Sequence, residues 1–328
     1  MWQNKLKYII VLIYLNYICD CAVMHSHSSH LNRERVEDGA YSPRDRGHVS
    51  ESDEHNSDFD HEAILGSIKD AEEFDHLTPA ESKRRLGILL QKMDLDGDKA
   101  ITRQELRAWI LRSFKMLTEE EAEERRQDVD TNNDGKVTWD EYVADTYGLG
   151  EDVSKEELEQ ENEELMADDK LMWEAADVNH DGILEGDEWV AFSHPEEHPV
   201  MMPIIMNQTL RERDTDNDGA ISFQEYIGER GKNRDKQWIY VEKDKFDREL
   251  DLNKDGKLTG NEILSWMVPS NEEIADEEVQ HLFVASDDDH DSLLSFEEIL
   301  IHHDVFVGSE ATDYGDHLHN IHQFQDEL

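Results

Sequence analysis

Residues 130–141 read DTNNDGKVTWDE, and the spacing of oxygen-bearing side chains in this stretch decides how we interpret the whole chain. Asp130, Asn132 and Asp134 occupy positions 1, 3 and 5, and Glu141 occupies position 12. A Ca²⁺ ion takes about six to eight oxygen ligands, and a twelve-residue loop can supply them from these side chains, from the carbonyl of residue 7 and through water at position 9. The stretch therefore predicts a calcium-binding loop between two helices.

Six stretches share this pattern, in order along the chain. They are DLDGDKAITRQE from Asp94, DTNNDGKVTWDE from Asp130, DVNHDGILEGDE from Asp177, DTDNDGAISFQE from Asp214, DLNKDGKLTGNE from Asp251 and DDDHDSLLSFEE from Asp287. One match can arise by chance, whereas six indicate EF-hand loops with Ca²⁺ as their ligand. The predicted ligands at positions 1, 3, 5, 7 and 12 are Asp94, Asp96, Asp98, Ala100, Glu105, Asp130, Asn132, Asp134, Lys136, Glu141, Asp177, Asn179, Asp181, Ile183, Glu188, Asp214, Asp216, Asp218, Ala220, Glu225, Asp251, Asn253, Asp255, Lys257, Glu262, Asp287, Asp289, Asp291, Leu293 and Glu298.

Apolar residues at two fixed positions predict how the loops pack. Position 8 is expected to point inward and to join two loops through a short strand, and it is occupied by Ile101, Val137, Leu184, Ile221, Leu258 and Leu294. Position 13 is expected to begin the buried face of the exiting helix, and it is occupied by Leu106, Tyr142, Trp189, Tyr226, Ile263 and Ile299.

Position 6 distinguishes the first and sixth loops from the other four. The sharp turn there requires a left-handed backbone, which glycine adopts without strain. The first loop has Lys99 and the sixth has Ser292 at this position, and a non-glycine residue in this conformation costs about 1–2 kcal/mol. We expect these two sites to be the weakest; the alternative is that both are degenerate loops that serve only for pairing.

The charge of the chain is strongly acidic. It has 80 acidic and 32 basic residues and a formal net charge of −48, and 22 of the carboxylates fall at positions 1, 3, 5, 9 and 12 of the six loops. Self-repulsion of this size destabilises a compact state, so we expect folding to be coupled to metal binding. Nucleic acid is excluded as a partner because its phosphates would be repelled.

The N-terminus predicts a secretory signal peptide over residues 1–21. Lys5 and Lys7 precede the apolar run YIIVLIYLNYI, and the small residues of CDCA follow. The run is shorter than the about 20 residues needed to span a bilayer, so stable membrane insertion is not expected, although an uncleaved anchor is the alternative. Cys19 and Cys21 both lie in this segment, so disulfides are not expected to stabilise the mature chain.

The C-terminus, Gln325-Asp326-Glu327-Leu328, resembles an endoplasmic reticulum retrieval signal of the KDEL type, which a receptor reads. Together with the leader it predicts the lumen of the endoplasmic reticulum, with partial secretion because Gln325 replaces the usual cation. Asn207-Gln208-Thr209 is a glycosylation sequon that this compartment could use.

The predicted fold is all-α, with three pairs of EF-hands and a disordered N-terminal segment. Loop starts are separated by 36, 47, 37, 37 and 36 residues, and we place the pair boundaries by the longest gap. The expected domains are a disordered acidic, His-rich segment over 22–63, pair one over 64–150, pair two with an acidic linker helix over 151–232, and pair three with the C-terminal tail over 233–328. Two histidine groups, His25 to His30 and the five residues His302, His303, His317, His319 and His322, are interpreted as solvated, with transition-metal capture as the alternative for both.

The architecture resembles the CREC family, the reticulocalbins and calumenins, and the QDEL ending favours a reticulocalbin. The resemblance rests on the six loops, the two terminal signals, and the stretches FSHPEEHP from Phe192 and DVFVGSEATDYGD from Asp304. It implies a low-affinity, multi-site calcium protein of the secretory pathway that binds client proteins or modulates luminal enzymes.

Three functions remain open from the sequence. The first is the luminal calcium-binding protein, retained or partly secreted, that the resemblance implies. The second is a sensor that opens a Met-rich groove for target helices, which Met201, Met202 and Met206 make conceivable. The third is an enzyme regulated by EF-hands; we expect no enzyme, because no segment is long enough for a catalytic domain and no nucleophile–base or phosphate-loop pattern occurs.

Overall fold

The computed structural model describes residues 35–49, 55–148 and 160–309. The predicted signal peptide, the His25–His30 tract, the tail histidines His317, His319 and His322, and the Gln325–Leu328 ending lie outside these residues. Within them, no helix is both long and apolar enough to cross a membrane.

The described chain is mainly helical, and each loop contributes one two-residue strand. In order, the elements are η2 (Arg44–Gly47), α3 (Asp58–Leu65), α4 (Ile68–Asp75), α5 (Pro79–Met93), β1 (Ala100–Ile101), α6 (Arg103–Val129), β2 (Val137–Thr138), α7 (Trp139–Tyr147), α8 (Gln160–Ala176), β3 (Ile183–Leu184), α9 (Asp187–Ser193), η4 (Pro195–Glu197), α10 (Met202–Arg213), β4 (Ile221–Ser222), α11 (Phe223–Ile227), η5 (Gly228–Asn233), α12 (Lys236–Lys245), the π-helical turn η6 (Phe246–Leu250), β5 (Lys257–Leu258), α13 (Asn261–Met267), α14 (Asn271–Ser286), β6 (Leu294–Ser295), α15 (Phe296–Ile301) and α16 (His303–Phe306). The predicted all-α class is confirmed.

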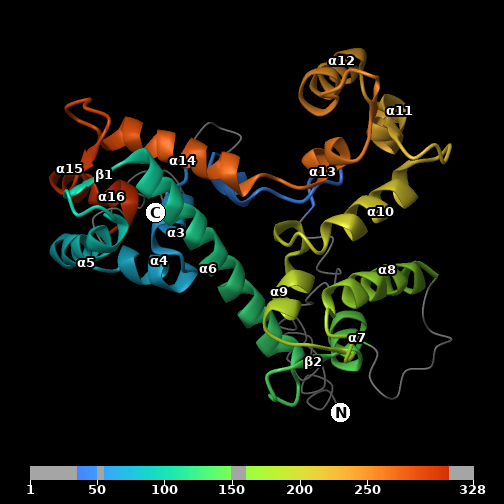
Figure 1. The fold of residues 1–328 in the computed structure, drawn as a ribbon, viewed down its shortest axis with the longest axis horizontal. Helices are drawn as coiled ribbons and strands as arrows, with labels where there is room; N and C mark the ends of the chain where they lie inside the picture. Colours follow the sequence, from blue (N-terminus) through green and yellow to red (C-terminus); the bar gives the residue numbers. More distant parts are fainter. Residues whose placement is uncertain (1–34, 50–54, 149–159, 310–328) are drawn as a thin grey trace, which may run out of the picture.

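Two hydrophobic cores divide these elements into two lobes (Figure 1). The terminal lobe contains α3–α5, the first half of α6 and α14–α16, and it carries the first and sixth loops. The central lobe contains the end of α6 and the elements α7 to α13, and it carries the second to fifth loops. Every apolar residue at position 8 is fully buried, and those at position 13 are at most 2% exposed, so both packing predictions are confirmed.

Helix α6 connects the two lobes as a single element of 27 residues. It begins with a capping box in which Thr102 and Glu105 satisfy each other's backbone N–H groups, and it contains no glycine or proline that would interrupt it. At about 1.5 Å per residue it extends roughly 40 Å. Its first half buries Ile110 and Phe114 in the terminal lobe, and its second half buries Val129 in the central lobe.

The six loops form three pairs, but the partners differ from those we predicted. The strand of the first loop pairs with that of the sixth, with Ala100 opposite Ser295 and Ile101 opposite Leu294. The second loop pairs with the third, and the fourth with the fifth. The predicted pairing of loops one with two, three with four and five with six is therefore wrong, and the domain boundaries drawn from it lose their basis.

The length of α6 explains the different pairing. Because this helix both leaves the first loop and enters the second, it holds the two loops at its opposite ends. The 47-residue gap that we took as a boundary instead connects two loops that pair with each other. The first and last loops are then left to pair across the whole length of the chain.

Part of the N-terminal segment is packed against the folded body. The backbone N–H of Tyr41 donates to the carbonyl of Met267 at 2.8 Å, and Tyr41 is only 1% exposed. Phe59 and Ala63 are buried in the terminal lobe. For residues 35–49 and 55–63 the prediction of disorder is therefore wrong, because their few apolar side chains find core positions.

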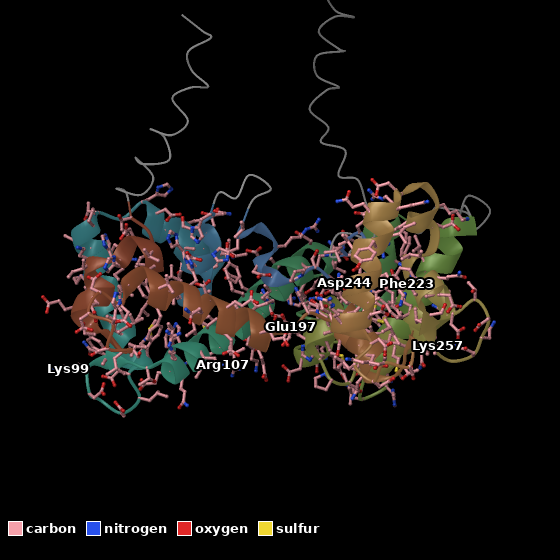
Figure 2. The ribbon with its side chains drawn as sticks, turned by 90° about the horizontal axis from the view of Figure 1, so that it is seen from above. Lys99, Arg107, Glu197, Phe223, Asp244 and Lys257 are labelled. Carbon is pink, nitrogen blue, oxygen red and sulfur yellow. The ribbon has the colours of Figure 1, made fainter. Side chains whose placement is uncertain are left out.

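A partly buried carboxylate joins the two lobes. Glu197, in the FSHPEEHP stretch, lies between the two halves of the molecule (Figure 2). It accepts hydrogen bonds from Arg44, from the hydroxyl of Thr118 on α6 at 2.7 Å, and from the amide of Asn271 on α14 at 3.0 Å. Burial raises the pKa of Glu197, but the charge of Arg44 and the hydrogen bonds outweigh this effect and hold the pKa below its usual range. This network ties η2, η4, α6 and α14 together.

A pair of engineered cysteines can test the loop pairing, because Cys19 and Cys21 both lie in the predicted leader. In the variant Ala100→Cys/Ser295→Cys the two thiols face each other across β1 and β6, so a disulfide should form under mild oxidation. In the control Ala100→Cys/Thr138→Cys, which pairs the first loop with the second in the same register, the thiols lie at opposite ends of α6. Non-reducing electrophoresis and peptide mass spectrometry show which variant forms the disulfide. A disulfide in the control alone would support pairing of the first loop with the second and contradict its pairing with the sixth.

Candidate metal centres

The six loops share one hydrogen-bonding pattern around the aspartate at position 1. This carboxylate accepts the backbone N–H of residue 6 at 2.8–2.9 Å in the four loops with glycine there. The same bond measures 3.0 Å from Lys99 to Asp94 and 3.2 Å from Ser292 to Asp287. The turn is therefore slightly looser in the first and sixth loops.

The backbone at position 6 is left-handed in all six loops, as predicted. Lys99 and Ser292 both have φ of 68°, where the glycines have φ of 81–85°. A Cβ atom placed on any of those four glycines would meet no heavy atom within 4 Å. The cost of a side chain at this position is therefore backbone strain, without any steric clash.

The loops bring their oxygen-bearing side chains together. In the first loop the carboxylates of Asp94, Asp96 and Glu105 lie within 4.8 Å of one another. The fourth and sixth loops do the same with the aspartates at positions 1, 3 and 5, which are Asp214, Asp216, Asp218, Asp287, Asp289 and Asp291. Ca²⁺ prefers hard oxygen donors, so these clusters of carboxylates fit that ion.

The second, third and fifth loops have asparagine at position 3. Its amide N–H donates across the loop to the glutamate at position 12, from Asn132 to Glu141 at 3.1 Å and from Asn253 to Glu262 at 3.2 Å. Asn179 approaches Glu188 in the same way at 3.5 Å. Positions 3 and 12 thus face each other, as two ligands of one ion must.

The glutamate at position 12 also lies in the first turn of the exiting helix. In the first, second, fourth and sixth loops it forms a capping box with the residue at position 9, as Glu225 does with Ser222. Burial raises the pKa of Glu225, but hydrogen bonds from Ser222 and Thr215 outweigh burial and lower it to about 2. This ligand is therefore ionised and already oriented at neutral pH.

Repulsion between carboxylates acts against these bonds in the first loop. The backbone N–H of Asp98 stabilises the Asp96 carboxylate, yet desolvation and the neighbouring charges of Asp98, Glu105 and Asp94 raise the pKa of Asp96. A divalent cation between these groups would remove that repulsion.

Two lysines cross between paired loops and contact their acids. Lys136 Nζ of the second loop lies 2.6 Å from Glu185 of the third. Lys257 of the fifth loop pairs with Asp218, a predicted ligand of the fourth. All four side chains are 35–50% exposed, and exposed pairs contribute about 0–1 kcal/mol, so they are weak competitors for a bound cation.

The sequon at Asn207 lies on α10. Asn207 is exposed, but Thr209 is 3% exposed and its hydroxyl donates to the carbonyl of Ile205 at 2.8 Å. Glycosylation of Asn207 stays a prediction, and the folded helix does not present the whole sequon.

One cluster of potential metal ligands was not predicted from the sequence. His48, His55, Asp60 and His281 place their ligand atoms within 4.8 Å of one another. The sequence does not predict this cluster, because His281 is more than 200 residues away from the other three and no fixed spacing links them. Only the folding of the N-terminal segment onto α14 brings them together.

Comparison with known proteins agrees with this geometry. The EF-hand domain pair family matches residues 83–147 and 243–302, and a second EF-hand domain pair family matches residues 207–228. The class of protein is therefore an EF-hand protein that binds Ca²⁺. The matches over 83–147 and 243–302 each cover two loops that are consecutive in sequence but do not pair in the structure.

The relatives define the family more narrowly. The chain is 39% identical to Reticulocalbin-2 of Crotalus adamanteus over 284 residues, which cover 84% of this chain and 93% of that protein. It is 40% identical to Reticulocalbin-2 of Mus musculus over the same share of this chain and 89% of the mouse protein. This chain belongs to the reticulocalbin family, and the predicted resemblance is confirmed.

Exchanging serine and glycine at position 6 tests the strain argument in both directions. Ser292→Gly should tighten the sixth site by roughly five- to thirtyfold, because about 1–2 kcal/mol of left-handed strain is removed. Gly219→Ser, the reverse change in the fourth loop, should weaken that site by a similar factor, since nothing obstructs the new side chain. Calorimetric Ca²⁺ titration measures both, and unchanged affinities in both variants would refute strain as the cause.

Proposed function

We propose that this chain is a low-affinity, multi-site calcium-binding protein of the endoplasmic reticulum lumen whose fold depends on its metal. The observation that carries the proposal is the convergence of acidic side chains in loops that the family uses for Ca²⁺. The leader over residues 1–21 and the ending from Gln325 support the compartment.

Each loop is proposed to hold one ion through positions 1, 3, 5, 7 and 12. The side chains at positions 1, 3, 5 and 12 and the carbonyl of residue 7 are the ligands that we predict for all six loops. Affinities of about 10⁻⁴–10⁻³ M are typical of modules that work outside the cytosol. The first and sixth sites are proposed to fill last because Lys99 and Ser292 are strained.

Metal binding is also proposed to drive the compaction of the chain. The formal charge of −48 opposes compaction, and repulsion is focused in loops such as the one around Asp96. A ligand that binds only the folded form stabilises it, and here it also neutralises the charge that opposes folding.

The loaded form is proposed to bind luminal client proteins or enzymes and, through Gln325–Leu328, a retrieval receptor. The alternative of a groove sensor has little support. Met201 is fully buried, and Met202 and Met206 are partly buried against the core of the central lobe. These methionines therefore contribute to the core, whereas an open groove would need them exposed.

Removal of Ca²⁺ should expand the molecule. In excess chelator the chain should lose tertiary structure and helix, because the loop carboxylates then repel one another without compensation. Addition of millimolar Ca²⁺ should compact it again. Small-angle scattering and circular dichroism measure the two changes, with Mg²⁺ at the same concentration as a control for ionic strength. An apo form as compact and helical as the loaded form would contradict metal-coupled folding.

Deletion of residues 325–328 should raise the secreted fraction sharply in cultured cells. Gln325→His should lower it below that of the unmodified chain, since the cation of the usual signal is restored. The measurement is the ratio of protein in medium and lysate, and a deletion of the same length at residues 310–313 controls for truncation. An unchanged ratio after the terminal deletion would favour a Golgi or extracellular protein, the secreted alternative, and would leave calcium binding untouched.

A further inference from the structure

The terminal lobe contains a compact group of imidazoles and carboxylates that none of the EF-hand loops uses. His48 follows η2, His55 lies beside Val49 in an isolated β-bridge, and Asp60 sits in the first turn of α3. His281 comes from α14, the helix that enters the sixth loop. The group therefore joins the N-terminal segment and the start of α3 to α14, which lies more than 200 residues further along the chain.

The ligand atoms of the four residues lie within 4.8 Å of one another, close enough to share one metal ion. His48 Nε2 lies 2.9 Å from His55 Nε2 and 2.7 Å from Asp60 Oδ1. Asp60 Oδ2 lies 3.2 Å from His55 Nε2 and 3.4 Å from His281 Nε2. Zn–N bonds of about 2.0–2.1 Å put neighbouring ligand atoms of a tetrahedron about 3.3 Å apart, so a zinc ion fits with small adjustments.

Two carboxylates are buried at this group of imidazoles. Asp60 on α3 is 0% exposed, and Glu278 on α14 is 2% exposed. None of their four oxygens accepts a hydrogen bond of good geometry from the described residues. The ion pairs that the described residues form with Asp60 come from imidazoles. Two neighbouring buried carboxylates are costly unless protons or a metal cation offset their charge.

Protonation of His48 and His281, whose pKa values Asp60 raises, can supply charge to Asp60, but His48 Nε2 has only one N–H for its two neighbours, His55 and Asp60. If His48 and His55 were both cationic, two N–H groups would point at each other across 2.9 Å. A single N–H···N bond between neutral rings would satisfy that contact, but it would supply no charge to Asp60 or Glu278. A divalent cation with neutral imidazole ligands supplies both the charge and the geometry.

We propose that His48, His55, Asp60 and His281 form a zinc site separate from the six calcium loops. Three imidazole nitrogens favour zinc over Ca²⁺, which binds oxygen ligands. Four protein ligands close the coordination shell, which is typical of a structural site. Glu278 Oε2, 3.9 Å from His48 Nε2, lies just outside the ligand atoms and completes the neutralisation of the ion.

The position of the site defines its effect. A bound ion fastens the segment around His48 and His55 to α3 and to α14, and α14 leads directly into the sixth loop. The zinc site therefore stabilises the lobe that carries the two strained calcium loops.

Zinc binding by the mature chain in saturating Ca²⁺ tests the proposal. Competition with a chromophoric chelator should show one tight Zn²⁺, and His281→Gln should weaken its binding by about 100-fold or more, because loss of a ligand costs at least as much as loss of an outer-shell partner. His281 is chosen because its side chain is 34% exposed, so its replacement should leave the fold intact, which circular dichroism verifies. The matched control His76→Gln changes an exposed histidine at the end of α4 and should bind as the unmodified chain does.

Two further measurements separate this site from other binding. Co²⁺ in place of Zn²⁺ should give the intense visible absorption of a tetrahedral ion, and Zn²⁺ should raise the Tm of the unmodified chain but not of His281→Gln. The variant His25→Gln/His27→Gln/His30→Gln should retain the site. The proposal is overturned if His281→Gln binds Zn²⁺ as tightly as the unmodified chain, if the triple variant alone loses it, or if Co²⁺ shows only the weak spectrum of an octahedral ion.

Discussion

The continuity of α6 is the constraint on which the rest of the architecture depends. An EF-hand exposes an apolar face at position 8 that another loop must cover, so no loop can remain alone. Since α6 carries the first two loops at its ends, each must find another partner. The second takes the third, the fourth takes the fifth, and the first can only take the sixth. The first and last EF-hands are thereby packed in one lobe, where the N-terminal segment and α14 come into contact.

This closure places the two exceptional loops in one pair. Lys99 and Ser292 are the two residues other than glycine at position 6, and their strands lie side by side in the terminal lobe. Paired loops share β-strand hydrogen bonds and a core, so strain in one is transmitted to the other. The lower affinity that we predict for the first and sixth sites is therefore a prediction about one lobe, and we expect the central lobe to bind Ca²⁺ more strongly.

The parts of the structure that depend on local sequence were predictable, and the parts that depend on distant contacts were not. The loops, their left-handed turns and the burial of Ile101 and Leu294 follow from twelve-residue patterns, because an EF-hand loop is set by its own side chains. Pairing is decided by where helices end, and the spacing of the loops did not indicate that one uninterrupted helix, α6, links the first loop to the second. The packing of Tyr41 was missed because a few apolar residues in a polar segment carry no periodic signal.

Both lobes gain stability from interactions that calcium does not provide. The network of Glu197 joins them through hydrogen bonds to Thr118 on α6 and Asn271 on α14, and neither residue belongs to a calcium loop. In the terminal lobe the imidazoles of His48 and His281 converge on Asp60, and His281 lies on α14, the helix that enters the sixth loop. A lobe with strained calcium sites and a net negative charge has most to gain from a second metal. Calcium loading and attachment of the N-terminal segment are then linked through α14, since whatever orders this helix favours both.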